Sequence, residues 1–515
     1  MILHRHWNES KAWWKAFSQF LPWPRYYLTG IYLSLQVLYL CTAILALKLL
    51  VQMFCINSCY EAQVDITRYR INGNRSLISR TRTVVPQNMR HACLESENVT
   101  QRSLSRMELT PELTPELLGF ISASPGVWSM FQLGELIAAF RDYEYEVISP
   151  LPSVCAAVNI VCAYALRING RDKIDWSDYC LHNALDMLPA IMTELPDSIA
   201  IGTLLLMTLI FASTSRLPTA AMILAIASQM MFLAGFHKMT ATPDETTTHK
   251  RRLLSYAYIL DQNLSLWLEK PPLLSSNFGL DLLEQEPYDG QGTIHLRDGI
   301  SVNCLREQVI LAKFQSKAYA TLRSPDSSSM SQEAYAEISR QLLEEPLQWR
   351  SNLPALVEPL LIPNDLDKKH APWLSAIFCT FYQVEIAIRS SIFSHKMFFD
   401  NADFRNQALL VVSSCASATR KLVAVVSSLD RSALQRSLTG HFSEVLRCLL
   451  PLVAWNLDSL FLHIAYYRHA PEVQHDARLI RNIVNLFEDN FPDYQQAKVY
   501  ATTKLLCDVA LRAIP

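Results

Sequence analysis

The chain has 515 residues, half of them hydrophobic, with 13 Gly and a formal net charge of −2. Near neutrality excludes a polyelectrolyte that binds nucleic acid through its overall charge, and the length suits several ordinary domains or one large helical one. Scarce Gly disfavours sandwiches and barrels, which need frequent turn glycines. The composition therefore predicts an all-α fold.

The 12 cysteines are scattered, and no C-x2-C pair occurs. This pattern is typical of free, mostly buried thiols in a reducing compartment. Zinc sites need thiolates at short, defined spacings, and the sequence has no such cluster. We therefore expect no metal and no other cofactor.

Residues 1–60 form a basic, tryptophan-rich N-terminus that contains an uncharged apolar segment, Leu28–Leu47. Residues 28–47 are long enough to cross a bilayer, and the cations before them would place that end in the cytoplasm. The apolar run is too long for a good cleaved signal, and no small-x-small site follows it. A single membrane span, a core helix and an artefact of gene modelling all remain open for this segment.

Residues 61–109 form a polar, arginine-rich stretch that we interpret as a flexible linker. The repeat LTPELTPELL at Leu109–Leu118 follows, and it contains two helix starts with Thr as the N-cap and Pro in the first turn. Thr110 or Thr114 is thus the expected entrance to a folded domain that covers residues 110–515.

Three uncharged runs lie in the first half of this domain, at Val147–Leu166, Ser198–Ser215 and Leu217–Phe236. Hydropathy alone would count them as membrane spans of a small transporter. The runs are rich in Ala, Ser and Thr, however, and they alternate with helices of soluble character. We interpret them as buried helices of one soluble core, since burial of each Leu or Ile contributes roughly 1.5–3 kcal/mol without lipid.

The stretch Thr219–Leu274 has two contrasting halves. Ala220–Phe236 is apolar on every side of a helical wheel, which predicts a fully buried helix. The second half is predicted to be amphipathic and to stop at Pro271-Pro272, with Lys270 at its C-terminus. Its apolar positions recur at helical spacing: Leu253, Ala257, Leu260, Leu264 and Leu268.

This pair of helices resembles the signature of the fungal-specific transcription factor domain, the middle homology region of fungal binuclear zinc-cluster regulators. The matching residues are Ala220, Ala227, Leu233, Gly235, Phe236, His237, Glu245, Arg251, Arg252, Tyr258, Leu260, Asp261, Ser265, Leu268 and Pro271. The departures are Met222, Ser228 and Gln262, and Glu269-Lys270 in place of the family's Gly-Arg. Weaker similarity extends over about 150–354 and includes Trp349.

The resemblance implies a large domain of stacked antiparallel helices in a nuclear, pathway-specific transcription regulator, which controls a metabolic or secondary-metabolite gene set. We interpret Asp261 and the Arg251-Arg252 doublet as a buried or half-buried pair that fixes helix packing, rather than as a binding site. Eight residues form the family signature with this structural role: Gly235, His237, Arg251, Arg252, Tyr258, Asp261, Ser265 and Pro271.

The zinc cluster that usually precedes this domain is absent, because the first hundred residues contain only Cys41, Cys55, Cys59 and Cys93, with the wrong spacing. DNA contact would therefore come through a partner protein or a missing zinc module. A homodimer or heterodimer is the expected assembly. A membrane-anchored helical protein tethered by residues 28–47 is the alternative.

Further helices are predicted at Leu305–Leu322, Ser331–Trp349, Trp373–Phe393, Val411–Leu429 and Leu434–His469. The acidic and aromatic run Leu486–Tyr494 is interpreted as a helix end and loop, with an activation segment as the less favoured reading. No enzyme is expected, because no nucleotide-binding, metalloprotease or hydrolase motif occurs. The paired aspartates Asp400 and Asp403 resemble half of a magnesium–diphosphate site, but a second metal motif is missing.

Overall fold

The computed structural model describes residues 130–145, 151–169, 174–214, 216–238, 245–274, 292–296, 299, 301–324, 327, 329–353, 371–391, 404–428, 453–454, 456–467, 469–490 and 498–513. All of them belong to the second of two compact units, which covers Glu95–Pro515. The apolar segment 28–47, the arginine-rich linker, the entrance at Thr110 or Thr114 and the Asp400–Asp403 pair lie outside the described residues.

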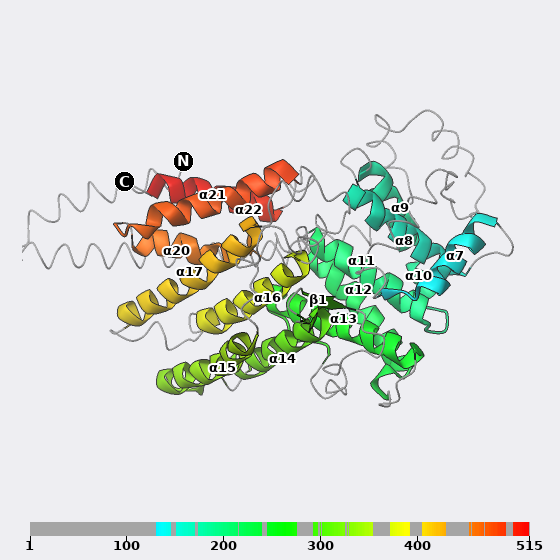
Figure 1. Ribbon diagram of the computed structural model, residues 1–515, viewed down its shortest axis with the longest axis horizontal. Helices are drawn as coiled ribbons and strands as arrows, with labels where there is room; N and C mark the ends of the chain where they lie inside the picture. Colours follow the sequence, from blue (N-terminus) through cyan, green and yellow to red (C-terminus); the bar gives the residue numbers. More distant parts are fainter. Residues whose placement is uncertain are drawn as a thin grey trace, which may run out of the picture. The chain divides into compact units, whose positions relative to one another are not determined.

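The first half of the described chain is a set of packed helices (Figure 1). They are α7 (Leu133–Tyr145), α8 (Pro152–Asn169), α9 (Ile174–Asp186), α10 (Leu188–Ile191), α11 (Ser198–Ser213), α12 (Leu217–Leu233), the short 3-10 helix η2 (Phe236–Lys238) and α13 (Glu245–Leu268).

The second half begins with a small antiparallel hairpin, in which β1 (Thr293–His295) pairs with β2 (Ser301–Asn303) and Ile294 lies opposite Val302. The helices that follow are α14 (Cys304–Leu322), α15 (Gln332–Asn352), α16 (Ala371–Ser390), α17 (Phe404–Ser428), α20 (Asp458–Tyr466), α21 (Glu472–Asn490) and α22 (Lys498–Ala513). The prediction of an all-α fold is confirmed for the described residues.

Helix α14 joins two hydrophobic cores. Val309 and Ala312 belong to a first core, which is otherwise built from α7–α13 and the segments next to them. Cys304 and Leu311 belong to a second core, shared with the hairpin and with α16, α17 and α20–α22. Because the two faces of α14 serve different cores, this helix couples the two halves of the described chain.

Helix α11 lies deepest in the first core. Twelve of its sixteen residues are buried, and its N-terminus is capped by Asp197, whose side chain accepts a hydrogen bond from the Ala200 amide at 2.6 Å. A Cβ atom added at Gly202 would lie 2.2 Å from the Met130 carbonyl oxygen. Only glycine therefore permits this approach of the segment before α7 to α11.

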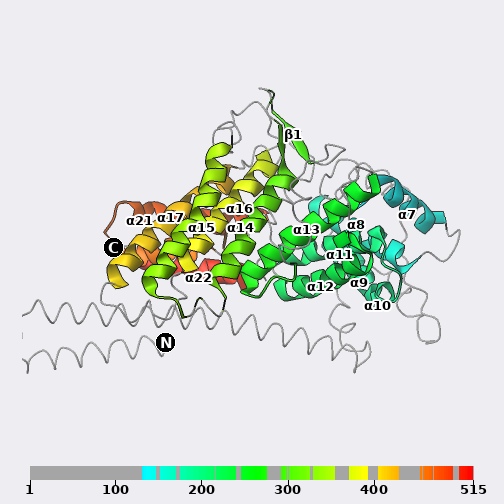
Figure 2. The same cartoon turned by 90° about the horizontal axis from the view of Figure 1, so that it is seen from below.

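The burial of α12 and α13 differs from the expectation at several residues. Helix α12, predicted to be fully buried, exposes Met222 and Leu233 at 69% and 78%. Helix α13, predicted to be amphipathic, buries Ser255 and Gln262 in addition to Asp261, for which burial is expected. The reason is the position of each helix: α13 packs against α11, α12 and α14, whereas α12 lies along the lower edge of the helices in Figure 2.

The apolar runs of the first half pack as core helices, α8, α11 and α12, in agreement with their interpretation as parts of a protein core. Among the described residues, the stretch Leu409–Ser427 of α17 is long and apolar enough to cross a membrane. Half of it is buried in the protein, and α17 packs against α16, α20 and α21. Length and composition therefore make a weak case for a span there.

The predicted helices of the second half are present as α14, α15, α16 and α17, the last of which begins earlier than expected, at Phe404. Of Leu434–His469, the structure describes only α20 and a few residues beside it. Helix α21 continues to Asn490, so Leu486–Asn490 is a helix end and the remainder of Leu486–Tyr494 lies outside the described residues. No helix is predicted from the sequence at α7, α9, α21 or α22, although the apolar residues of α21 recur at helical spacing.

The contrast between the two sides of α12 generates a first prediction. Leu224→Lys should destabilise the protein by several kcal/mol, because Leu224 is fully buried and the new ammonium would lack a partner. Met222→Lys is the matched control on the same helix and should change the free energy of unfolding by less than about 0.5 kcal/mol. Urea denaturation followed by circular dichroism measures both. Equal destabilisation would contradict the assigned burial.

Candidate functional site at the end of helix α13

The eight signature residues lie in two places. Gly235 and His237 follow the C-terminus of α12, and the other six lie on α13 or just beyond it. The structure brings Asp261, Ser265 and Pro271 together, through Lys270. We call the group Asp261, Ser265, Lys270 and Pro271 the α13 clasp.

Asp261 is the buried centre of the α13 clasp. Its side chain is fully buried, and Oδ1 accepts a hydrogen bond from Lys270 Nζ at 3.1 Å. Oδ2 accepts the backbone amides of Leu273 and Leu274 at 2.6 and 2.8 Å. A buried carboxylate is tolerable only when paired and hydrogen-bonded, and here both oxygens have partners. The carboxylate therefore folds the segment after α13 back against the helix.

Lys270 closes the α13 clasp from the solvent side, with a quarter of its side chain exposed. Besides Asp261, its ammonium donates to Ser265 Oγ at 3.2 Å and to the Pro271 carbonyl oxygen at 3.3 Å. An ammonium has three N–H donors, so these acceptors match its full capacity. These three contacts fix the direction of the chain after α13.

The helix end itself has the geometry in which glycine is favoured. The Lys270 amide donates to the Ser265 carbonyl oxygen at 3.1 Å, the long hydrogen bond of a Schellman motif. The residue in the left-handed position of that motif is Glu269, with φ of +51°. This is the position where the family that the sequence resembles has Gly. Here Glu269 adopts the strained conformation, and its carboxylate lies 3.4 Å from Arg323, the C-cap residue of α14.

Gly235 has the corresponding role after α12. Its φ is +75°, and its amide donates to the Phe232 carbonyl oxygen at 3.1 Å. The chain then turns into η2, where Phe236 is buried and the exposed His237 meets the Phe232 ring edge-on, with centroids 5.8 Å apart. Lys250 of α13 lies 5.6 Å from the Phe236 ring centroid, so this turn packs on the start of α13.

The Arg251-Arg252 doublet lies at the other end of α13. Arg251 is half-buried and Arg252 is buried, as is Tyr258. Ten residues of helix separate the first arginine from Asp261, a rise of about 15 Å. The doublet and Asp261 are therefore separate groups, and the partner of Asp261 is Lys270. Sequence spacing did not reveal this, because Lys270 follows the helix end, where helical periodicity no longer applies.

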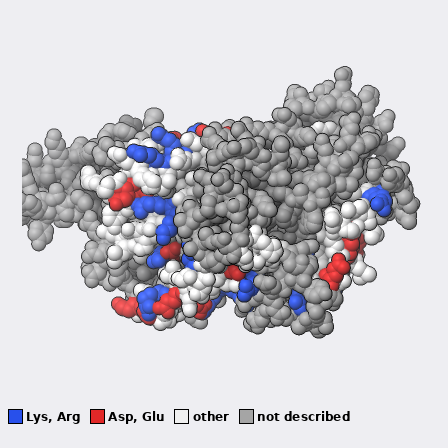
Figure 3. Space-filling view, viewed as in Figure 1, with Lys and Arg blue, Asp and Glu red and all other residues white. Residues whose placement is uncertain are grey.

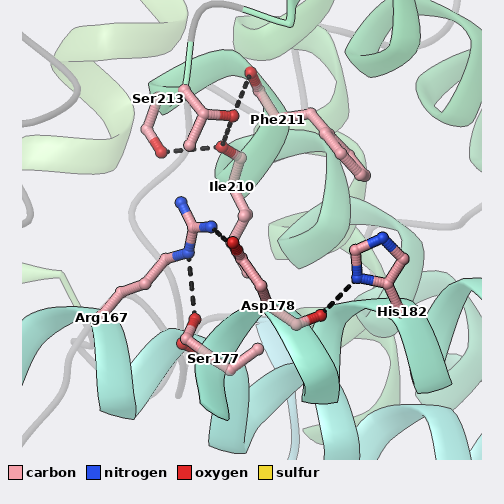
Figure 4. Close-up of polar contacts among 9 residues, drawn as sticks. Arg167, Ser177, Asp178, His182, Ile210, Phe211 and Ser213 are labelled. Carbon is pink, nitrogen blue, oxygen red and sulfur yellow. Dashed lines mark hydrogen bonds and ion pairs between the residues drawn. The ribbon is translucent and has the colours of Figure 1, made fainter. Parts of the chain in front are cut away.

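Other polar contacts fix neighbouring helices. Trp349 of α15 donates from Nε1 to Glu307 Oε2 of α14 at 2.8 Å, which gives a structural role to the Trp of the resemblance. Figure 4 shows Arg167, near the end of α8, reaching two residues of α9. Its Nε donates to Ser177 Oγ at 3.0 Å, and Nη2 pairs with Asp178. These contacts set helix positions and leave no reactive group poised.

A second buried ionic cluster, which the sequence did not indicate, connects α17, α20 and α21. Arg420 donates to both oxygens of the fully buried Asp476, at 2.6 and 2.9 Å, and His463 Nδ1 lies 2.7 Å from Asp476 Oδ2. The His463 ring stacks on Tyr467 with centroids 4.7 Å apart. Burial opposes ionisation of Asp476, but the hydrogen bonds from His463 and Arg420 outweigh it and lower the pKa of this carboxyl.

The remaining titratable groups do not indicate catalysis. Burial raises the pKa of Cys180, Cys304 and Cys415 to about 12, so these thiols are not reactive at neutral pH. No group of His, Cys, Asp and Glu side chains within the described ranges is arranged to hold a metal. On the face in Figure 3, red and blue side chains alternate over α15, which is the pattern of a solvated helix surface.

The chain is similar to two curated fungal proteins, each named ABC-transporter-regulating transcription factor, from Aspergillus fumigatus and Aspergillus oryzae. Each is 26% identical over 231 residues, which is 42% of this chain and 25% of the relative. The chain thus spans about a quarter of the length of these curated relatives. No protein-family model matches the chain, and no solved structure matches it. The relatives belong to the class that the Thr219–Leu274 resemblance indicates, fungal transcription factors.

The energetic cost of the left-handed conformation at Glu269 can be measured with two variants. Glu269→Ala removes the contact with Arg323 but keeps a side chain in the left-handed conformation. Glu269→Gly removes the contact with Arg323 and also the side chain itself, so this variant should be more stable than Glu269→Ala by about 1 kcal/mol. Thermal and urea unfolding measure the difference. If the glycine variant were less stable than the alanine variant, the left-handed conformation at this residue would be disproved.

The Asp476 cluster predicts a particular pH dependence. The folded-state pKa of Asp476 lies below its unfolded value near 3.9, so the carboxylate stabilises the fold above about pH 4 and this stabilisation disappears as the pH falls through the folded-state pKa. Asp476→Asn should lower the free energy of unfolding by about 3 kcal/mol at pH 7, and this loss should become smaller below pH 4. Urea titrations at several pH values test this. The exposed Asp186→Asn is the control and should show a small, pH-independent effect.

Proposed function

We propose that the chain is a fungal transcription regulator that acts through its helical region. The observation that carries the proposal is its similarity to two fungal transcription factors, together with the signature residues of Thr219–Leu274. The geometry supports a regulatory role, because the α13 clasp and the Asp476 cluster fix helices to one another and leave no reactive group exposed. The proposal includes no catalytic activity.

The proposed mechanism uses the two coupled cores. A metabolite or partner protein that binds one half favours one packing of the helices, and α14 transmits the change to the other half because it belongs to both cores. DNA contact is supplied by a partner protein or by a zinc module that this sequence lacks. The protein works in the nucleus, as a homodimer or heterodimer.

The target is a pathway-specific gene set, in metabolism or secondary metabolism. The names of the two relatives make genes for membrane transporters the first candidates within that set. The match covers a quarter of the length of each relative. The proposed preference for transporter genes therefore concerns the whole regulator, and no single helix or contact of this chain is assigned to it.

The test is a tethering experiment in a fungal cell. The full chain is fused to a heterologous DNA-binding domain upstream of a reporter gene, and reporter transcripts should change severalfold relative to the DNA-binding domain alone. Fusion of Leu224→Lys should abolish the change at matched protein level, whereas Leu410→Lys on α17 should retain it, since Leu224 is buried and Leu410 is 69% exposed. Unchanged transcripts with the folded wild-type fusion would refute a regulatory role.

A membrane-anchored helical protein is the alternative, tethered by residues 28–47, which lie outside the described part of the chain. Fluorescent tagging of the full chain and of a chain without residues 1–60 separates the two. Nuclear signal from both chains agrees with the regulator. Membrane signal that disappears on removal of residues 1–60 would establish the alternative.

A further inference from the structure

The outward face of α12 is an exposed apolar stripe. Met222 and Leu233 are 69% and 78% exposed, Ile226 is half-buried between them, and Gln229 is exposed. Their spacing of four, three and four residues is that of a helix–helix seam, and it places them along one side of α12 over about 16 Å. Large apolar side chains that are this exposed are unusual when they share one helix face.

Helix α12 is uncharged along its length, and one cation lies beyond each of its ends. No Asp, Glu, Lys or Arg occurs between Arg216 and Lys238, and both of these cations are exposed. Arg216 lies 5.9 Å from the Phe211 ring centroid, and neither cation has a carboxylate partner among the described residues. An apolar centre with a polar rim is the usual anatomy of a protein interface.

The side of α12 opposite the stripe is firmly held. Ala220, Leu224 and Ala227 are fully buried, and α12 packs against α11 and α13. At the end of the α11–α12 hairpin where Leu233 lies, Leu195 precedes α11 and is 89% exposed. The stripe is therefore presented on a rigid support, which lowers the entropy lost when a partner binds.

We infer that this face of α12 binds an amphipathic helix of a partner protein, with an apolar stripe that lies on Met222, Ile226 and Leu233 and acidic residues at both ends. The acidic ends complement Arg216 at one end and Lys238 at the other. Such helix-on-helix recognition through residues at i, i+4, i+7 and i+11 is a common mode of peptide binding. The inference goes beyond regulation of transcription and holds whether or not the chain regulates genes.

Charge complementarity disfavours two other occupants. A second copy of α12 in antiparallel orientation would place Arg216 beside Lys238 of the other copy, and a parallel copy would place like residues together, so both repel. The apolar stretch Leu28–Leu47 of the same chain is flanked by Arg25 and Lys48 and therefore also lacks acidic ends. An acidic partner helix avoids both conflicts.

The test uses two synthetic helical peptides of about 20 residues, matched to the length of α12. Both carry leucines at i, i+4, i+7 and i+11, and they differ in having glutamates or lysines at the two ends. Binding of fluorescein-labelled peptide to the purified full chain is measured by anisotropy. The glutamate peptide should bind, and the lysine peptide should bind at least about tenfold more weakly.

Protein variants locate the binding. Leu233→Glu should weaken binding of the glutamate peptide about tenfold. Leu410→Glu, at a similarly exposed position on α17, should leave the binding unchanged. The double variant Arg216→Glu, Lys238→Glu should reverse the preference between the two peptides. Circular dichroism should show the same helix content in all of these chains.

Several outcomes would overturn the inference. These are equal affinity for the two peptides, no binding of either, or binding that survives Leu233→Glu. A concentration-dependent dimer in sedimentation that Leu233→Glu abolishes would instead assign the face to a second copy. Co-sedimentation with phosphatidylserine vesicles that Leu233→Glu abolishes, without peptide binding, would assign it to a lipid surface. None of these results depends on whether the chain affects transcription.

Discussion

The carboxylate of Asp261 is the constraint on which the first half of the fold depends. It is fully buried on a helix that packs against α11, α12 and α14, and an ionised group there needs a complete set of partners. The chain provides them by turning back immediately after α13, so that two amides and the Lys270 ammonium meet the two oxygens. The position of the segment after α13 is thus a consequence of one buried charge.

The Asp476 cluster applies the same principle in the second core. Asp476 is fully buried, and its partners come from two other helices, Arg420 on α17 and His463 on α20. A buried charge whose partners lie on separate elements stabilises only one relative arrangement of those elements. Each core therefore contains one ionic group that specifies packing, and α14 contributes apolar residues to both cores.

Helix α12 shows that an apolar composition does not by itself lead to burial. It is almost as apolar as α11, yet α11 is enclosed by neighbours whereas one side of α12 is free among the described residues. Helix α13 contains more polar residues than either and is more deeply buried than α12, because Ser255 bonds to its own helix and Gln262 bonds to the Leu274 carbonyl oxygen. Internal hydrogen bonds allow polar side chains to be buried, and an apolar surface without a cover indicates an interface.

The sequence by itself determined the helical class, the positions of α8 and α11–α16 within a few residues, and the stop of α13 before Pro271-Pro272, because helical periodicity, scarce Gly and Pro act locally. The signature in Thr219–Leu274 likewise indicated the class of the two fungal relatives. Only the tertiary structure decided that Asp261 pairs with Lys270, that Glu269 takes a left-handed conformation, and that α13 is buried more completely than α12. Those features depend on which elements become neighbours, and a pattern within one helix contains no information about the surfaces that cover it.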